Sequence, residues 1–159
     1  MNISTPDLCD EFEESLSILS PGFRDFGGVH QFYGQAVTIS CLNDNSKIKA
    51  MSVTSGHGKV MVVDGQASMD YALLGDMIGD DLVKNGWSGI IINGCIRDVE
   101  ALKTLQLGIK ALNSIPRRSV KRDQGEVNVT LHFAGATVDP EDWVYADESG
   151  IVVSKHKLI

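Results

Sequence analysis

The fold is decided by the segment from Gly75 to Asp98, which reads Gly-Asp-Met-Ile-Gly-Asp-Asp-Leu-Val-Lys-Asn-Gly-Trp-Ser-Gly-Ile-Ile-Ile-Asn-Gly-Cys-Ile-Arg-Asp. It predicts a loop, a helix, a turn, a short buried strand and a second loop that ends in Arg97-Asp98. Two loops that each lead into a helix therefore flank one strand, and each loop carries a carboxylate. Arg97 is the only cation between Lys84 and Lys103.

Around this segment, strands and helices are predicted to alternate. Residues 59–64, 89–93 and 109–112 are apolar runs typical of buried strands. One helix is predicted to end at Asn85-Gly86, because glycine favours the left-handed conformation that stops helices. A second helix begins at Asp98, and residues 71–74 are expected to form a short turn of helix. This order predicts a parallel α/β layer with right-handed crossovers.

The first third of the chain adds a helix and a strand. Thr5 is predicted to cap a helix with Pro6 at its first helical position, and Leu8, Phe12 and Leu16 recur every four residues on one face. Alternating residues from 31 to 42 predict a strand, followed by a short helix over 47–53.

The last third changes to antiparallel β-structure. Residues 127–133 alternate between apolar and polar side chains, and residues 143–146 and 151–154 flank a hairpin-like turn. We therefore predict one α/β domain, residues 1–159, with a mixed sheet or a second β layer.

Composition limits the cellular setting. No apolar run approaches the ~18 residues of a membrane span, and the amino terminus shows no signal-peptide pattern. The three cysteines are widely spaced and odd in number, which favours a reduced, cytoplasmic setting.

The net charge of −7 argues against direct binding to nucleic acid, because phosphate recognition needs a basic face. One basic cluster exists, Arg117-Arg118-Ser-Val-Lys121-Arg122, directly after Pro116. It is open to two interpretations: a solvated loop or subunit contact, or a site for RNA or another anion.

The two loops of the opening segment together predict an anion and metal site. Gly75-Asp76 opens a helix, so the amides of Met77 and Ile78 point outward without partners, and such an end binds anions. Arg97 offers a planar fork that matches a carboxylate. Loops after adjacent parallel strands share one edge of the sheet, which would bring Asp98 near Asp76. Mg²⁺ takes one or two such carboxylates and keeps several waters.

A simpler interpretation stays open, because aspartate is a favoured helix cap and both aspartates stand at helix starts. Other candidates are weaker. Asp64 could add a carboxylate to the same edge, and His57, His132 and Cys95 are each explained by packing or surface exposure. The segment around the site contains no lysine placed for Schiff-base chemistry.

The motifs also carry a resemblance. Asp76, twenty intervening residues and then Arg97-Asp98 resemble the signature of the class II pyruvate aldolases of the 4-hydroxy-4-methyl-2-oxoglutarate aldolase family. That family includes the protein called regulator of ribonuclease E activity A. The resemblance covers nearly the whole chain and extends to residues 62–65, 72–76, 94–98, 145–147 and 150–153.

The resemblance implies a swivelling β/β/α-type domain and a ring-shaped homotrimer with active sites between subunits. It implies that Asp98 binds Mg²⁺ or Mn²⁺, that Asp76 positions a metal-bound water, and that Arg97 grips the carboxylate and enolate oxygen of pyruvate. The amides of Met77 and Ile78 would hold the same carboxylate. The implied reactions are cleavage of 4-hydroxy-4-methyl-2-oxoglutarate or a similar small 2-oxo acid to pyruvate, and decarboxylation of oxaloacetate.

Retro-aldol cleavage and decarboxylation both pass through an enolate, which a Lewis-acid metal and an arginine stabilise. The chain departs from the aldolases at Asp139-Pro-Glu-Asp142, where they more usually show Pro-Gly-Asp, and it is short. The shorter family branch implies an alternative role, inhibition of ribonuclease E through an outer surface.

Overall fold

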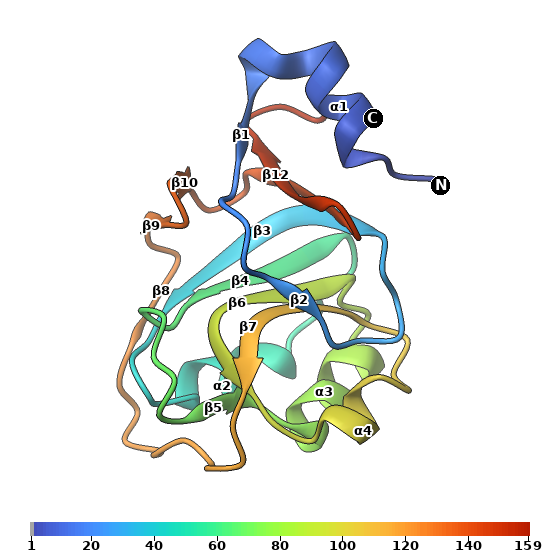
Figure 1. Cartoon of the computed structure of the whole chain (residues 1–159). Coiled ribbons are helices and arrows are strands. Elements are labelled where there is room, and N and C mark those ends of the chain that lie inside the picture. Colours follow the sequence, from blue (N-terminus) through green and yellow to red (C-terminus); the bar gives the residue numbers. More distant parts are fainter. Residues whose placement is uncertain (1) are drawn as a thin grey trace.

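The computed structural model describes residues 2–159, and its centre is one ten-stranded mixed sheet (Figure 1). Strands follow the order β1-β12-β11-β3-β4-β6-β7-β2, with β5 paired to β6 and β8 paired to β3. The predicted α/β fold with a mixed sheet is confirmed. The strands are β1 (Leu16–Ile18), β2 (Arg24–Asp25), β3 (Phe32–Ser40), β4 (Lys59–Asp64), β5 (Ala72–Leu74), β6 (Gly89–Ile96), β7 (Gly108–Ser114), β8 (Glu126–Val127), β9 (Leu131–Phe133), β10 (Ala136–Val138), β11 (Trp143–Asp147) and β12 (Gly150–Ser154).

Four short helices and a 3₁₀ turn complete the described chain. They are α1 (Thr5–Phe12), the 3₁₀ turn Glu13–Ser15, α2 (Ser46–Ser52), α3 (Asp76–Lys84) and α4 (Val99–Leu102). No helix among residues 2–159 is long and apolar enough to cross a membrane.

The parallel strands β3, β4, β6 and β7 form the buried centre of the sheet. Every residue of β6 is buried, which explains its unbroken apolar run. Burying an isoleucine side chain stabilises the fold by about 1.5–3 kcal/mol, and Ile90, Ile91 and Ile92 are all fully buried. The sheet therefore needs a layer on each face.

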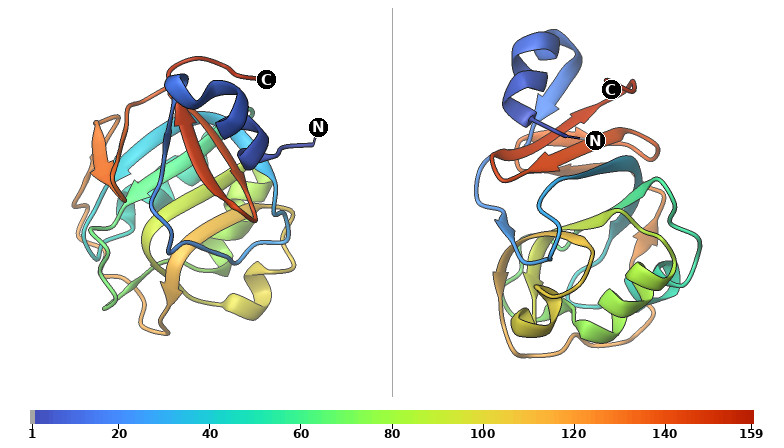
Figure 2. Two further views of the ribbon diagram at one scale, coloured as in Figure 1. Left: turned by 45° about the horizontal axis from the view of Figure 1, so that its top comes forward. Right: turned by 90° about the vertical axis from the view of Figure 1, so that its right-hand side faces the viewer.

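Figures 1 and 2 show these two layers. The helices α2, α3 and α4 cover one face, where Met61 and Val63 of β4 pack with Leu82 of α3. On the other face, Val60 and Val62 pack with residues of β9–β10 and of the β11–β12 hairpin, which belongs to the same sheet. Alternate residues of β4 thus belong to different cores, as the period of a strand requires.

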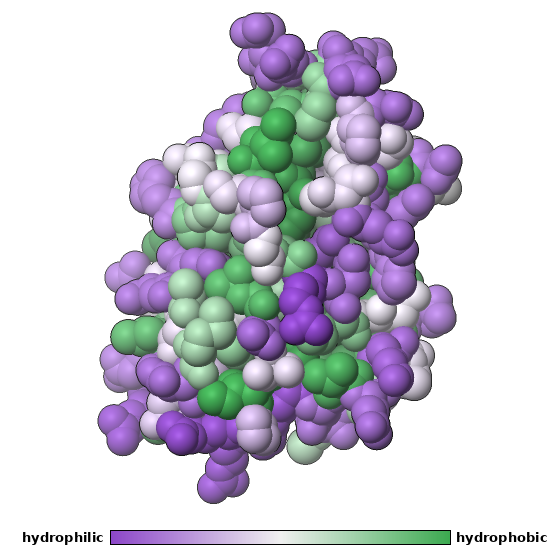
Figure 3. All heavy atoms as spheres, viewed as in Figure 1, coloured by the Kyte–Doolittle hydropathy of each residue, from purple (hydrophilic) through white to green (hydrophobic). Residues whose placement is uncertain are grey.

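The amino-terminal helix differs from its prediction in both ends. Ser4, not Thr5, is the N-cap, and its hydroxyl accepts a hydrogen bond from the amide of Asp7. Thr5 is instead buried, and its backbone amide and hydroxyl donate hydrogen bonds to the carboxylate of Asp147 at 2.7 and 2.6 Å. The helix ends at Phe12, and Leu16 begins β1. Figure 3 shows hydrophilic side chains over this α1 end of the molecule.

The expected helical turn over residues 71–74 is wrong. Residues 72–74 form β5, which runs parallel to β6 and pairs Ala72 with Cys95. All three residues of β5 are buried, and the carbonyl of Leu74 accepts a hydrogen bond from the amide of Arg97 at 2.9 Å. Tertiary pairing with β6 therefore overrides local propensity here.

The predicted strand over residues 127–133 is broken in two. Asn128 has a φ of +58°, which separates β8 from β9.

A second left-handed residue, Glu141 with φ +72°, lies in the turn at Asp139–Asp142. Glycine is the residue suited to that conformation, so the departure from Pro-Gly-Asp places a glutamate in a strained position. The helix predicted to begin at Asp98 is also short, ending at Leu102.

Candidate active site

The two loops of the opening segment meet because β5 and β6 are parallel neighbours. Their carboxyl ends lie at one edge of the sheet, so the β5–α3 loop and the β6–α4 loop run side by side. The bond from the amide of Arg97 to the carbonyl of Leu74 joins them directly. This edge is where α/β sheets bind ligands.

Gly75, Asp76, Arg97 and Asp98 form the centre of the site. The amide of Asp76 donates a hydrogen bond to Oδ2 of Asp98 at 2.9 Å. A Cβ on Gly75 would lie 2.7 Å from that oxygen and 3.4 Å from Nε of Arg97. The structure therefore brings the predicted residues together. Asp98 and Arg97 can approach the backbone of Gly75 this closely because glycine has no side chain.

The helix-cap interpretation does not describe Asp98. It stands at the N-cap of α4 with φ +57°, yet its side chain makes no capping bond to α4. Its carboxylate reaches across to the first amide of α3 instead. The backbone of Asp98 thus starts α4, since its carbonyl accepts a hydrogen bond from the amide of Leu102 at 2.9 Å, while its side chain joins the two loops.

The first turn of α3 leaves two amides facing outward. The helical bonds begin with the amide of Gly79, which donates to the carbonyl of Gly75 at 3.0 Å. Within residues 2–159, the amides of Met77 and Ile78 have no hydrogen-bond acceptor outside the helix, and they lie too near its start to have one inside. This end of α3 therefore presents two donors and a positive dipole to an anion.

A pocket of about 240 Å³ contains all of these groups. Its walls include the candidate residues from 75–78 and 97–98, together with Lys49 of α2 and Arg118, Ser119 and Lys121. We call residues 117–122 the basic segment. Three residues of the basic segment line the pocket, with Arg118 and Lys121 exposed to solvent and Ser119 buried. This position is compatible with anion binding, and it leaves the solvated-loop and subunit-contact interpretations open.

The sequence predicts that the site region offers no lysine for Schiff-base chemistry, but two lysines from other segments reach the pocket. Lys49 and Lys121 both line the pocket. The Lys121 ammonium donates to Oδ1 of Asn45 at 2.9 Å. Burial is the largest cause that lowers the pKa of Lys121, followed by repulsion from Lys49 and Arg97. Sequence spacing does not reveal this group, because the contact between residues 45 and 121 spans 76 positions.

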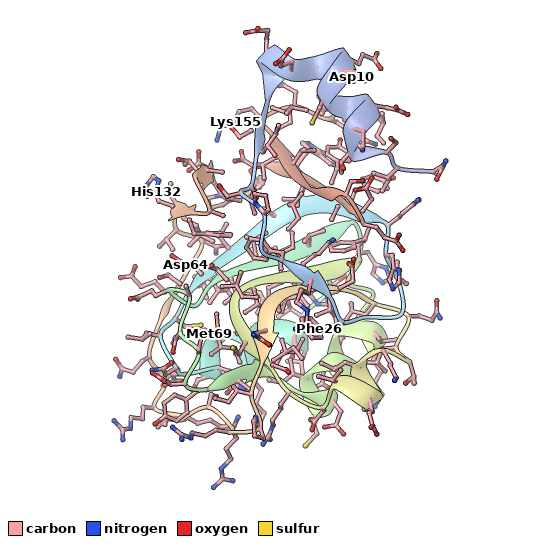
Figure 4. All side chains as sticks on the ribbon, viewed as in Figure 1. Asp10, Phe26, Asp64, Met69, His132 and Lys155 are labelled. Atoms are coloured by element: carbon pink, nitrogen blue, oxygen red, sulfur yellow. The ribbon has the colours of Figure 1, made fainter. Side chains whose placement is uncertain are left out.

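The remaining candidates from the sequence lie outside the pocket. Oδ1 of Asp64 accepts hydrogen bonds from Gln66 and Asn93 at 2.9 Å and shapes its own loop. His57 packs against Gly86, where a Cβ would lie 2.4 Å from its ring. Figure 4 places Asp64 and His132 on the side where β8 and β9 run in Figure 1.

Cys95 is close to Arg97 in sequence but faces elsewhere. It is 1% exposed, and its thiol contacts the sulfur of Met69 at 3.3 Å. Burial raises the pKa of the Cys95 thiol, which makes it a poor nucleophile.

The donor set suits a hydrated hard cation. Residues 2–159 contain no cluster of three or more His, Cys, Asp or Glu side chains that could enclose a metal ion. Oδ2 of Asp98 accepts a hydrogen bond from the amide of Asp76, and the side chains of Asp76 and Asp98 are both exposed. One or two carboxylates with several waters is the environment that Mg²⁺ commonly takes. These residues therefore fit Mg²⁺ or Mn²⁺ and do not fit a closed structural zinc site.

Comparisons with known proteins point to one family. A model of the RraA-like family, described as Aldolase/RraA, matches residues 5–153. A protein of Xanthomonas campestris pv. campestris (strain B100), named "Putative 4-hydroxy-4-methyl-2-oxoglutarate aldolase", is 49% identical over 158 residues, 99% of this chain and 95% of that protein.

Two solved structures share the fold over nearly their whole lengths. The RNA-processing inhibitor RraA from Thermus thermophilis is 33% identical with a TM-score of 0.96, over 100% of this chain and 96% of that one. A Geobacillus kaustophilus HTA426 protein described as S-adenosylmethionine: 2-dimethylmenaquinone methyltransferase is 36% identical with a TM-score of 0.96, over 98% and 97%.

Proposed function

The chain belongs to the RraA-like family, and from that premise we propose that it is a divalent-metal-dependent class II aldolase. Its reaction would be cleavage of 4-hydroxy-4-methyl-2-oxoglutarate or a similar 2-oxo acid to pyruvate, with decarboxylation of oxaloacetate as a second activity. The observation that carries the proposal is the joining of Asp98, Arg97 and the open end of α3 in one pocket.

Each group in that pocket has a role in holding a 2-oxo acid. The outward amides of Met77 and Ile78 would bind its carboxylate at the positive end of α3. The guanidinium of Arg97 would bind the same carboxylate and the enolate oxygen, where charge develops in the transition state. The exposed carboxylate of Asp76 would orient a water for proton transfer.

Asp98 is the residue proposed to hold the metal, with Asp76 acting through water. A bound Mg²⁺ or Mn²⁺ supplies Lewis acidity that stabilises negative charge on the 2-oxo group. The amide of Asp76 donates a hydrogen bond to Oδ2 of Asp98 and so holds the Asp98 carboxylate in place.

The cations that α2 and the basic segment contribute to the pocket wall support a substrate with a second carboxylate. Lys49, Arg118 and Lys121 lie there together, although the chain as a whole has a net charge of −7. Both 4-hydroxy-4-methyl-2-oxoglutarate and oxaloacetate carry two carboxylates, so one could meet α3 and Arg97 while the other meets this wall.

The same charges argue against a methyltransferase role of the kind in the Geobacillus description. S-adenosylmethionine carries a positive sulfonium, and the pocket presents Arg97, Lys49, Arg118 and Lys121. Like charges repel strongly in a partly enclosed site. An anionic 2-oxo acid is the better match.

The direct test is pyruvate release from oxaloacetate and from racemic 4-hydroxy-4-methyl-2-oxoglutarate, followed with lactate dehydrogenase. We expect turnover with Mg²⁺, loss of turnover with excess EDTA, and recovery when Mg²⁺ is restored. Because Mg²⁺ alone decarboxylates oxaloacetate slowly, the Asp98→Ala protein with Mg²⁺ serves as the blank. Turnover equal to that blank would sink the proposal.

The lysines in the pocket call for a second control. An aldolase that used Lys121 or Lys49 would form an imine with pyruvate, which borohydride reduces to a stable adduct. We expect the intact mass to remain unchanged after this treatment. An adduct together with EDTA-resistant turnover would replace the metal-dependent mechanism with a lysine-dependent one.

The family resemblance also leads us to propose a ring-shaped homotrimer with the pocket at a subunit boundary. Apolar side chains stand exposed beside the pocket, with Met77 77% exposed and Val99 37% exposed. Exposed apolar groups at the mouth of a site commonly mark an interface. Light scattering during gel filtration measures the assembly, and a monomer at micromolar concentration would contradict it.

A second candidate function, inhibition of ribonuclease E in the cytoplasm, rests on the likeness to the Thermus protein, whose description is that of an RNA-processing inhibitor. Such binding would use an outer surface, so both functions are compatible. A pull-down with the ribonuclease at physiological salt tests it, and absence of binding would count against it.

A further inference from the structure

The basic segment reaches the pocket without any helix or strand of its own. It lies between β7 and β8, and its residues 117, 118, 121 and 122 are exposed. Burial is the largest cause that lowers the pKa of Lys121, the like charges of Lys49, Arg97 and Arg118 add to it, and the negative charge of Asp44 opposes it. Repulsion from these cations favours release of the segment into solvent. Backbone bonds hold its first part, from the amide of Ala72 to the carbonyl of Arg117 and from the amide of Val120 to the carbonyl of Asn43, and its far end needs a further anchor.

Asp44 is the side chain that provides this anchor. It is 3% exposed and lies between β3 and α2. Its Oδ2 accepts hydrogen bonds from the amides of Arg122, at 2.7 Å, and Gln124, at 3.2 Å. Its Oδ1 accepts from the amide and hydroxyl of Ser46, at 2.8 and 2.6 Å. One buried carboxylate thus joins the start of α2 to the far end of the basic segment.

The neighbouring residue extends this connection into the pocket. The backbone amide of Asn45 donates a hydrogen bond to Oγ of Ser119 at 3.2 Å, and its side-chain Nδ2 donates to the carbonyl of Leu73 at 3.2 Å. Its remaining side-chain oxygen accepts from the Lys121 ammonium at 2.9 Å. The backbone that Asp44 holds is therefore the backbone that places Lys121.

We propose that Asp44 is a positioning residue, which fixes the basic segment so that Lys121 meets the second anionic group of the substrate. This inference rests on the proposed function. Asp44 does not itself line the pocket, so it acts through the segment rather than on the reacting atoms. An interaction that holds a remote group equally in the ground and transition states changes KM and leaves kcat nearly unchanged.

The ionised state of Asp44 supports this role. Burial by itself would raise the pKa of Asp44, but hydrogen bonds from Ser46, Arg122 and Gln124 outweigh burial and lower the pKa to about 2. The carboxylate therefore accepts all four bonds throughout the neutral range. An amide in its place has one acceptor oxygen and would turn an NH₂ group toward the segment.

The test compares Asp44→Asn with Asp123→Asn. Asp123 lies directly beyond the basic segment, and its exposed carboxylate pairs with Lys47 at 2.9 Å, so this control removes a carboxylate without removing the buried anchor. For Asp44→Asn we expect KM for oxaloacetate to rise about tenfold with kcat within about twofold of the wild type. Asp123→Asn should change neither value by more than about twofold.

Two further measurements keep the test independent of turnover and of folding. Amide hydrogen exchange over residues 117–124 should accelerate in Asp44→Asn at least about tenfold, and the binding of pyruvate, which has one carboxylate, should stay within about twofold. Ser46→Ala is the milder variant, because it removes one hydroxyl that bonds both Asp44 and the amide of Asp123. It should shift KM and exchange in the same direction by a smaller factor.

The outcomes separate this inference from the proposed function. If the wild type shows no metal-dependent turnover, the aldolase proposal fails, while exchange over residues 117–124 still decides whether Asp44 anchors the segment. If wild-type turnover is present but Asp44→Asn leaves both KM and exchange unchanged, the positioning role is overturned. A fall in kcat with unchanged KM would also overturn it.

Discussion

At the residue scale, Gly75 lies against the two side chains on which the proposed chemistry depends. A Cβ at this position would be 2.7 Å from Oδ2 of Asp98 and 3.4 Å from Nε of Arg97. Contacts shorter than 3 Å force something to move, and the free end here is the Asp98 carboxylate. Asp98 in turn is held by a single amide, that of Asp76.

Gly75→Ala should therefore damage activity more than stability. Because a displacement of about 1 Å at a catalytic group can cost about 100-fold, we expect kcat/KM for oxaloacetate to fall about 100-fold. Gly150→Ala is the matched control, since a Cβ there meets nothing within 4 Å. Equal activities for the two variants would show that the contact between Gly75 and Asp98 is unimportant.

Asp98→Ala separates a metal ligand from a helix cap. The side chain is exposed and its recorded bond is to the Asp76 amide, so its removal should cost about 1 kcal/mol or less in stability. Metal-dependent turnover should fall about 1,000-fold. Circular dichroism melts and steady-state kinetics measure both; an unfolded variant, or an active one, would favour the capping role.

At the element scale, tertiary pairing decides several boundaries that local patterns left undecided or predicted wrongly. Residues 72–74 become a strand because β6 continues past Asn93, where its pairing with β4 ends, and β5 pairs with Cys95 and Ile96. The strand expected over 127–133 breaks at Asn128, whose φ is +58°. The turn before β11 keeps Glu141 at φ +72°, where its amide donates to the carbonyl of Ala36 at 2.8 Å.

Glu141→Gly should stabilise the protein. A left-handed non-glycine residue costs roughly 1–2 kcal/mol, and part of that gain is offset by the entropy of glycine in the unfolded chain. The net expectation is a rise of about 0.5–1 kcal/mol in the free energy of unfolding, measured by urea titration. Glu126→Gly in β8, which lacks a positive φ, should instead destabilise. If the free energy of unfolding changed in the same direction in both variants, the strain at Glu141 would be contradicted.

At the scale of the whole molecule, two aspartates tie distant parts of the chain together. Burial would raise the pKa of Asp147, but bonds from Thr5, Ser149 and Gly150 lower it, and they join α1 to the β11–β12 hairpin. Asp44, with its pKa lowered to about 2, joins α2 to the basic segment. Both carboxylates are more acidic in the folded state than in the unfolded chain.

Stability should therefore fall in acid. A lowered folded-state pKa contributes stability that is fully present above the unfolded value, 3.8, and is lost as the pH falls through the folded value, about 2 for Asp44. For Asp44 this contribution is about 2 kcal/mol. Urea unfolding at pH 7, 4 and 2.5 should show the difference between wild type and Asp44→Asn narrowing as the pH falls. A constant difference would contradict the lowered pKa.

The sequence by itself determined the central unit of the fold and the core of the site. Its apolar runs mark the buried strands, and the spacing from Asp76 to Arg97-Asp98 identifies the residues that the two loops bring together. These features are predictable because helix and strand periods are local, and because parallel strands place their following loops at one edge.

Only the tertiary structure decided what faces those residues. The bond between Asp44 and Arg122 spans 78 positions, and the one between Asn45 and Lys121 spans 76. No local period connects such distant segments, so residues 117–122 look like a plain exposed loop in sequence. The pairing of β5 with β6 brings this loop to the pocket. The loop is held there because a buried polar group such as Asp44 needs hydrogen-bond partners, and the folded chain supplies them from distant residues.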